Sequence, residues 1–285
     1  MLNPLAATAF AALLLTAGTV LAAPTECPEQ FLRGQAPDLV NSKLAPKTRA
    51  LCYSAFAVLH SGVTRTSLWS AEHLTRERIE AALKQPRQGS FHPEERLPQE
   101  ERARLADYRK SGYDRGHLAP SGDMPDPVSM EESFSLANMV PQVPELNRGL
   151  WERIETAVRE LAIKDGDLYV VTGPVFRGAT LQRINDRVLV PSDVYKAVYD
   201  VRTGQAAAYL APNAAPSDQW QTVSIADLQT ISGIDVFPGL PGAAKATAME
   251  LPQPAPRGGR RQKAETAMPG RLAAEAVDSG SMTPR

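Results

Sequence analysis

Four consecutive residues, Asp114-Arg115-Gly116-His117, bring an acid, a cation and an imidazole together in a chain that has only four histidines. The imidazole of His117 titrates near neutral pH, so it can take a proton from a water molecule. Arg115 carries a planar, permanent charge that suits phosphate oxygens, and Gly116 lets the backbone approach a bulky substrate. Asp114 can orient the imidazole or the guanidinium. This group predicts phosphodiester hydrolysis, which needs a base and a cation for the developing charge.

A second polar group lies on the predicted helix 147–163, whose apolar residues recur at helical spacing. A polar ribbon beside the apolar stripe consists of Asn147, Trp151, Glu155 and Arg159. A helix rises 1.5 Å per residue, so Asn147 and Glu155 stand about 12 Å apart along its axis. We therefore expect Asn147 to be the metal ligand and Glu155 to reach water held by the metal. An amide oxygen with several waters suits Mg²⁺, with Mn²⁺ as the alternative.

The same helical residues also have structural interpretations. Asn147 can cap the N-terminus of the helix, and Glu155 can pair with Arg159 as an ordinary surface ion pair. Trp151 is expected in the core. It is the ordered occurrence of both polar groups that favours a catalytic site.

The ordered motifs DRGHLAP (114–120), NMVPQ (138–142) and NRGLW (147–151), followed by Glu155, are similar to those of a known family. They resemble the DNA/RNA non-specific endonucleases, which include mitochondrial endonuclease G and secreted bacterial nucleases. The resemblance covers about residues 52–240. It implies a ββα-metal active site and sequence-independent cleavage of DNA and RNA that leaves 5′-phosphates.

The resemblance also implies a role for each matching residue. His117 is similar to the family's general base, Asn147 to its single protein ligand for Mg²⁺, and Glu155 to the carboxylate that holds metal-bound water. Arg159 matches an arginine near the scissile phosphate, and two residues, Arg115 and Asn138, match residues that line the site. The family has a further substrate-binding arginine upstream, for which Arg65, Arg76 and Arg78 are all candidates.

Rival classes of function find less support. The chain has neither the HExxH motif of zinc peptidases nor the GxSxG motif of serine esterases. A catalytically inactive nucleic-acid-binding protein on the same scaffold is the alternative, but His117, Asn147 and Glu155 are intact. The formal net charge of -1 provides no overall basic field, so phosphate binding must come from local placement of Arg and Lys.

The N-terminus predicts export. Residues 5–21 form an apolar run that ends in a small-residue cleavage site after Ala22, typical of a signal peptide over residues 1–22. The mature protein is therefore expected to be periplasmic or secreted, without a membrane segment. In that compartment Cys27 and Cys52 should form a disulfide.

The remaining pattern predicts an α+β fold. A central, mainly antiparallel β-sheet with packed helices and a ββα-metal unit should occupy residues 23–240. Residues 84–104 are polar and Pro-punctuated, which indicates a surface excursion. Residues 241–285 lack the apolar content for a core and are expected to be a disordered tail. The substrates are expected to be DNA and RNA, while a homodimer and an inhibitor protein remain open.

Overall fold

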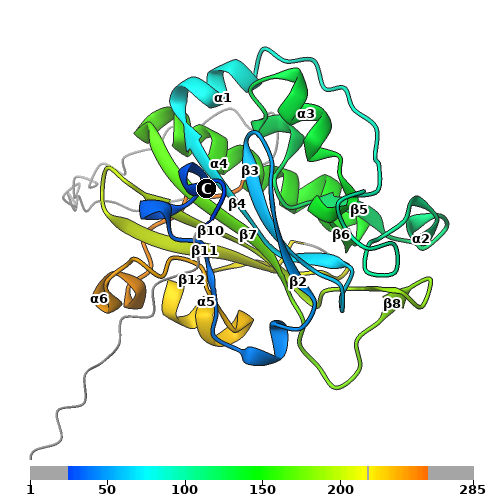
Figure 1. Ribbon diagram of the computed structural model, residues 1–285. Helices are drawn as coiled ribbons and strands as arrows, with labels where there is room; N and C mark the ends of the chain where they lie inside the picture. Colours follow the sequence, from blue (N-terminus) through cyan, green and yellow to red (C-terminus); the bar gives the residue numbers. More distant parts are fainter. Residues whose placement is uncertain (1–24, 217, 256–285) are drawn as a thin grey trace, which may run out of the picture. The chain divides into compact units, whose positions relative to one another are not determined.

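A seven-stranded antiparallel sheet organises the chain in the computed structural model, which describes residues 25–216 and 218–255. Its strand order is β12-β11-β10-β7-β4-β3-β2 (Figure 1). The strands are β2 (Thr48–Cys52), β3 (Phe56–Ser61), β4 (Thr66–Thr75), β7 (Asp167–Val175), β10 (Asp193–Asp200), β11 (Gln205–Pro212) and β12 (Gln221–Val223). Helices pack on this sheet, which confirms the predicted α+β class.

Helices cover both faces of the sheet (Figure 1). One face carries α1 (Arg76–Ala82), α3 (Pro127–Ser133) and α4 (Glu152–Asp165), and the other carries α5 (Ile225–Ser232) and α6 (Gly242–Ala246). The central strands carry apolar side chains on both faces of the sheet, because helices bury both faces. Ile154 and Val158 of α4 pack against Leu168 and Val170 of β7 in one of the two large cores.

The short elements complete the chain. They are η1 (Pro28–Gln30), η2 (Leu32–Gly34), β1 (Asp38–Leu39), η3 (Ser42–Leu44), α2 (Leu105–Tyr108), β5 (Asp114–His117), η4 (Ser121–Asp123), η5 (Leu136–Asn138), β6 (Met139–Gln142), η6 (Leu146–Trp151), β8 (Arg183–Ile184), β9 (Val188–Leu189) and β13 (Ile234–Asp235).

Both halves of the predicted site lie on one face of the sheet. Strands β5 and β6 form an antiparallel pair in which His117 is opposite Met139. The chain then enters η6, a π-helical turn, and continues directly as α4. The predicted helix is present and ends beside Gly166, whose φ of 94° provides a left-handed cap. Its first turn is wider than an α-helix, which the sequence pattern did not show.

Of two expectations about surface segments, the one for residues 84–104 holds for most of the segment and the one for the tail was wrong at its start. Residues 84–104 do not simply lie on the surface, because Phe91 packs against His117 and Leu97 is buried. The predicted tail does not begin at residue 241, since Gly242–Ala246 forms α6 and both Met249 and Leu251 lie in the core beside α4. The segment has few apolar residues, but Met249 and Leu251 are buried because they pack into a core that other elements form.

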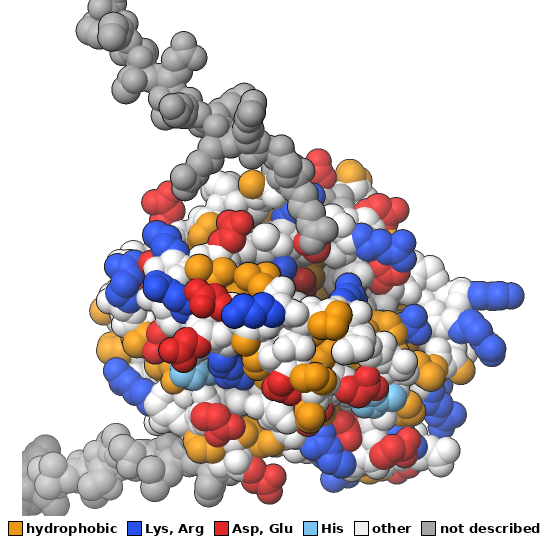
Figure 2. All heavy atoms as spheres, turned by 90° about the horizontal axis from the view of Figure 1, so that it is seen from above, with side chains coloured by type: hydrophobic (Ala, Val, Ile, Leu, Met, Phe, Trp, Pro, Cys, Tyr) orange, Lys and Arg blue, Asp and Glu red, His pale blue; other side chains and the backbone are white. Residues whose placement is uncertain are grey.

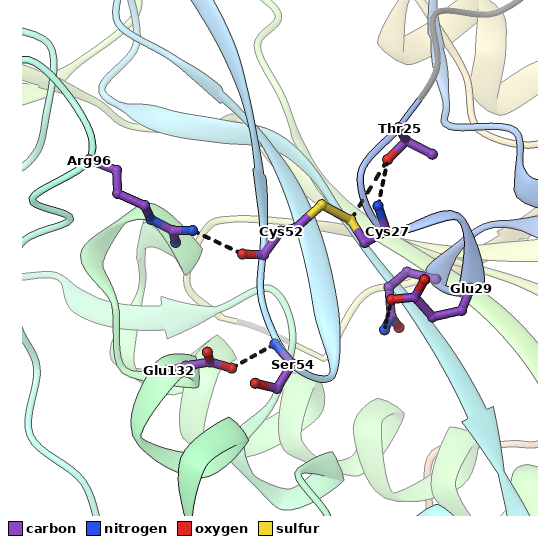
Figure 3. Close-up of a disulfide and its surroundings, with 8 residues drawn as sticks. Thr25, Cys27, Glu29, Cys52, Ser54, Arg96 and Glu132 are labelled. Atoms are coloured by element: carbon purple, nitrogen blue, oxygen red, sulfur yellow. Dashed lines mark hydrogen bonds between the residues drawn. A yellow bond between two sulfur atoms is a disulfide. The ribbon is translucent and has the colours of Figure 1, made fainter.

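The predicted disulfide between Cys27 and Cys52 is present and ties the N-terminal segment to the end of β2 (Figure 3). On its far side, Arg96 donates a hydrogen bond from Nη1 to the carbonyl oxygen of Cys52 at 2.9 Å. The predicted signal peptide and residues 256–285 of the predicted tail lie outside the described residues. Among the helices that are described, none has the length and apolar content needed to cross a bilayer.

Candidate active site

Asp114 connects the two halves of the site. Its Oδ2 accepts a hydrogen bond from Nδ2 of Asn147 at 2.9 Å, across 33 residues of sequence. Arg148 donates to both carboxylate oxygens, at 2.7 and 2.6 Å. Burial alone would raise the pKa of Asp114, but the bonds from Arg148 and Asn147 lower it below its ordinary value. Asp114 is therefore an anion that orients the amide of Asn147, and Asn147 does not act as a helix cap.

The donor set fits a hydrated divalent cation. Because Nδ2 of Asn147 is held by Asp114, the amide oxygen Oδ1 is the atom left for a metal. The described residues contain no cluster of three or more His, Cys, Asp or Glu side chains that could enclose an ion. A single neutral oxygen ligand leaves the remaining coordination positions to water, which Mg²⁺ tolerates and structural zinc does not.

His117 ends β5 in an aromatic enclosure. Its ring lies 5.7 Å from Phe91 and 5.2 Å from Phe134 between centroids, and the residue is 9% exposed. Burial lowers the pKa of His117 to about 3, with the charge of Arg87 acting in the same direction. The imidazole is thus neutral at physiological pH. Its Nε2 is buried and has no hydrogen-bond partner among the described residues, which is unusual for a polar atom in a core.

Gly116 has a structural reason that the sequence did not reveal. A Cβ at this position would lie 2.1 Å from Oε1 and 2.7 Å from Cβ of Gln142, whose side chain covers the strand. The expected approach of a substrate to Gly116 therefore does not explain the glycine. Close packing of β5 against Gln142 explains it.

Two arginines from different segments lie against the aromatic rings that enclose His117. The guanidinium of Arg115 lies 4.2 Å from the Phe91 ring centroid, and that of Arg87 lies 5.9 Å from Phe134. Arg87 is exposed and was not among the candidates for the upstream substrate arginine. Its signal in the sequence was weak, since residues 84–104 resembled a solvated loop.

The three upstream candidates have structural partners elsewhere. Arg65 donates to the carbonyl oxygens of Glu100 and Arg187. Arg76 donates to the carbonyl of Ile163, and Arg78 donates to those of His73 and Ala55. Their guanidinium groups hold loops and helix ends, so the structure does not bring them to His117.

The segment that carries Arg87 and Phe91 is fixed by a buried carboxylate. Glu94, 6% exposed, accepts hydrogen bonds from Tyr53 at 2.5 Å, from Ser135 at 3.2 Å and from Arg96 at 2.8 Å. Burial would raise the pKa of Glu94, but the bonds from Arg96 and Tyr53 lower it to about 2. The enclosure around His117 therefore depends on contacts made by residues distant in sequence.

Arg159 and Glu155 occupy the middle of α4. Arg159 donates to Asp123 Oδ1 at 2.8 Å and to Thr156 Oγ1 at 2.9 Å, so its ion-pair partner is Asp123 of η4. The alternative of a Glu155–Arg159 surface pair is not what the structure shows. Burial raises the pKa of Glu155 to about 7, against the opposing charges of Lys196 and Arg159. Asp123 is a site neighbour that sequence reasoning missed.

Asn138 lies beneath the site and not at its surface. It is fully buried, its Oδ1 accepts from the backbone N–H of Ala119, and its Nδ2 donates to the carbonyls of Ala119 and Ser133. Its side chain ties the loop that follows His117 to the end of α3. Asn213 has a similar structural use, because it bonds Val143 N, Pro141 O and Pro191 O.

The sequence of the chain matches a known protein family over most of its length. The family described as DNA/RNA non-specific endonuclease matches residues 38–243. This chain belongs to the DNA/RNA non-specific endonuclease family. That membership confirms the resemblance inferred from the motifs.

Individual members of the DNA/RNA non-specific endonuclease family show the extent of the likeness. Mitochondrial nuclease EXOG of Danio rerio is 36% identical over 210 residues, which make up 66% of this chain and 60% of that protein. Mitochondrial endonuclease G of Caenorhabditis elegans is 32% identical over 210 residues, or 67% of this chain and 68% of that one. The matched region thus spans only about three fifths of the first relative.

A solved structure supports the fold of this endonuclease-family chain. The structure described as the crystal structure of the EndoG/EndoGI complex superposes with a TM-score of 0.60 at 26% identity. The superposition covers 70% of this chain and 89% of the other. The fold and the family therefore agree.

The surface charge of this endonuclease-family chain is mixed. Lys and Arg side chains are interspersed with Asp and Glu side chains on the face seen from above the site-bearing helices (Figure 2). No extended basic block is visible on that face where side chains are drawn in colour. A phosphate-binding site on that face would therefore have to rely on individually placed arginines, in line with the net charge of -1.

Proposed function

We propose that the protein is an endonuclease that hydrolyses phosphodiester bonds in DNA and RNA without sequence preference, leaving 5′-phosphates. The observation that carries the proposal is that one short strand, β5, holds both the neutral, enclosed His117 and Asp114, whose carboxylate orients the amide of Asn147. Family membership supports the reaction type. The residues around His117 offer charge and oxygen ligands and no base-reading element, which favours recognition of phosphate over sequence.

In the proposed reaction His117 is the general base. It takes a proton from water while the water oxygen forms a bond to phosphorus and the bond from phosphorus to the 3′-oxygen breaks. Arg87 and Arg115 approach His117 from two sides and bind phosphate oxygens. Arg159 is held by Asp123 near the same phosphate, where it offsets developing charge. We assign Asn138 a positioning role, because its contacts fix the loop after His117.

We further propose that Mg²⁺, or Mn²⁺ in its place, binds at Oδ1 of Asn147. Such an ion supplies a Lewis acid for the leaving oxygen and water to protonate it. Glu155 would hold water of such an ion by accepting its hydrogen bonds, and the charges of Lys196 and Arg159 favour the carboxylate form. Asp114 keeps the amide of Asn147 in the orientation that presents oxygen.

We also propose that the mature protein works in the periplasm or outside the cell. The disulfide between Cys27 and Cys52 supports this, because such bonds persist in oxidising compartments. The apolar run at residues 5–21 supplies the export signal. The mass of the intact protein purified from its source tests both points, since a cleaved leader and an oxidised pair each change it. A mass that includes residues 1–22 and two thiols contradicts the proposal.

The decisive test is plasmid cleavage. We expect nicking and then degradation of DNA and of RNA with Mg²⁺, complete loss in EDTA and 5′-phosphate ends in the products. Full activity in EDTA, discrete restriction-like bands or 3′-phosphate ends contradict the mechanism. Binding without cleavage under all metal conditions supports the alternative, a catalytically inactive nucleic-acid-binding protein.

A further inference from the structure

A buried ammonium lies directly under the candidate site. Lys196 of β10 is 1% exposed, and its Nζ donates to Oγ1 of Thr172 at 2.6 Å and to the carbonyl oxygen of Leu118 at 3.5 Å. Leu118 follows His117 in the chain. Lysine is rarely buried unless its charge is compensated. Both acceptors are neutral, so a nearby carboxylate is needed to compensate most of the charge of Lys196.

The site helix carries a carboxylate that acts on Lys196 through its charge, with no direct ion pair between the two among the contacts of the described residues. The Nζ atom of Lys196 lies 6.0 Å from the centroid of the Trp151 ring, and Glu155 follows Trp151 by one helical turn on the same side. Among the charges around Glu155, Lys196 does most to lower its pKa against the effect of burial. The other charged neighbours of Glu155 are Arg159 and Glu152 on α4 and Asp123 on η4.

These other neighbours do not replace Lys196. Asp123 repels Glu155, and its own hydrogen bond from Arg159 at 2.8 Å occupies part of that guanidinium. Glu152 also carries a negative charge and raises the pKa of Glu155. Of the two cations beside Glu155, Arg159 is therefore shared with Asp123, which leaves Lys196 as the principal counter-charge.

A second carboxyl group, that of Glu72, faces the same ammonium from β4. Ser70, Thr172 and Lys196 are paired in one row across β4, β7 and β10, and Glu72 lies two residues after Ser70 on the same face. Glu72 is 0% exposed, and neither of its carboxyl oxygens has a hydrogen-bond partner among the residues described. Burial, and then the charge of Asp123, raises the pKa of Glu72 well above its ordinary value. A raised pKa favours the uncharged form of Glu72, so Glu155 is the carboxylate that compensates the charge of Lys196.

We propose that Lys196 is a positioning residue of the nuclease site, which holds the carboxylate of Glu155 as an anion and fixes the backbone carbonyl that follows His117. The inference rests on the proposed nuclease function. Lys196 acts through Glu155 and Leu118 and does not itself touch substrate. Glu72 is its neutral neighbour and provides the matched control.

The experiment compares Glu72→Gln with the double variant Glu72→Gln/Lys196→Met. The double variant removes both buried ionisable groups, so it leaves neither of them unpaired in the core. Without the ammonium the pKa of Glu155 rises, and activity appears only at higher pH. We expect the acid limb of the kcat profile to move up by about one pH unit or more, and Mn²⁺ binding measured by calorimetry at pH 7 to weaken about fivefold or more.

The control variant defines the outcome. Glu72→Gln should retain the acid limb of the wild type to within about half a unit, because a neutral amide replaces a neutral acid. An unmoved acid limb and unchanged Mn²⁺ affinity in a folded double variant overturn the inference, as does an equal shift in Glu72→Gln alone. If the double variant does not unfold cooperatively, Glu72→Gln/Lys196→Gln keeps a donor for Thr172 and should show the same shift.

The two proposals fail in different ways. A wild-type protein that binds Mn²⁺ but cleaves no nucleic acid removes the proposed function, while calorimetry on the same variants still tests Lys196. A wild type that cleaves with Mg²⁺, with variants that match its pH profile and metal affinity, removes only the role of Lys196.

Discussion

The amide nitrogen of Asn147 donates a hydrogen bond to Oδ2 of Asp114 at 2.9 Å, and this contact decides which atom of Asn147 faces the proposed metal. An amide can present either oxygen or nitrogen, and only oxygen binds Mg²⁺. Asp114 thus orients the proposed metal ligand. Residues in this role commonly have a large effect on metal affinity.

Asp114→Ala should therefore weaken Mg²⁺ and Mn²⁺ binding by about 10- to 100-fold, since the amide of Asn147 loses its orientation. Asn147→Ala should lose activity that extra metal restores only in part. Calorimetric titration with Mn²⁺ and the Mg²⁺ dependence of cleavage measure both effects. Arg148→Ala is the control, because it removes an exposed partner of Asp114 and should change affinity little. Equal losses in Asp114→Ala and Arg148→Ala would show that the ion pair, and not the amide, matters.

His117→Ala should reduce kcat by about 10²- to 10⁴-fold while the protein stays folded. The reason is the loss of the base, since no other imidazole is enclosed by Phe91 and Phe134. Single-turnover cleavage of a plasmid measures the effect. His73→Ala, at a histidine that pairs with Asp167 on another strand, should cleave like the wild type. Wild-type cleavage by His117→Ala removes the assignment.

Arg87→Ala should raise KM and make substrate binding less dependent on salt. A lost phosphate contact reduces the slope of log affinity against log salt by about one unit. Arg76→Ala is the matched control, because Arg76 donates a hydrogen bond to the carbonyl of Ile163, away from His117. Binding of a short duplex in Ca²⁺ at several salt concentrations measures the slopes. Identical slopes for the two variants contradict a phosphate contact by Arg87.

Glu94→Gln should lower the free energy of unfolding at pH 7 by about 3 kcal/mol at most. The folded-state pKa of Glu94 is lowered to about 2, so its stabilisation is present above its ordinary pKa of 4.5 and is lost as the pH falls towards 2. Urea unfolding at pH 7 and at pH 3 should therefore show the difference shrinking with acid. Glu95→Gln, at an exposed neighbour paired with Arg102, should change little at either pH.

Reduction of the disulfide between Cys27 and Cys52 should lower the melting temperature without abolishing cleavage. The bond closes a loop of about 25 residues, which corresponds to about 3 kcal/mol in the chain-entropy model. Calorimetry with and without a reductant, alongside the variant Cys27→Ser/Cys52→Ser, measures the loss. Both cysteines lie far from His117 in sequence, and their loss leaves its aromatic enclosure in place. A reduced protein that is folded but inactive contradicts this expectation.

The family, the fold class and the disulfide could all be predicted from the amino-acid sequence. The motif around His117 and the four-residue spacing of the polar residues on the helix are local patterns. Their chemistry can therefore be inferred from neighbouring residues of the sequence. The end of α4 could also be predicted, because Gly166 adopts a left-handed conformation that few other residues accept. Such features depend on residues close together in the chain, so a sequence displays them directly.

The surroundings of these residues depend on tertiary contacts that the sequence does not display. Arg87 and Phe91 lie in a polar segment with no regular pattern, and they reach His117 because Glu94 fixes that segment to Tyr53 and Ser135. Residues 242–251 contain few apolar side chains, yet Met249 and Leu251 enter a core that other elements had already formed. Lys196 lies among apolar residues of β10, and its burial depends on contacts with β4, β7 and α4. Contacts between residues far apart in sequence leave no local pattern, which is why these positions could not be predicted from the chain alone.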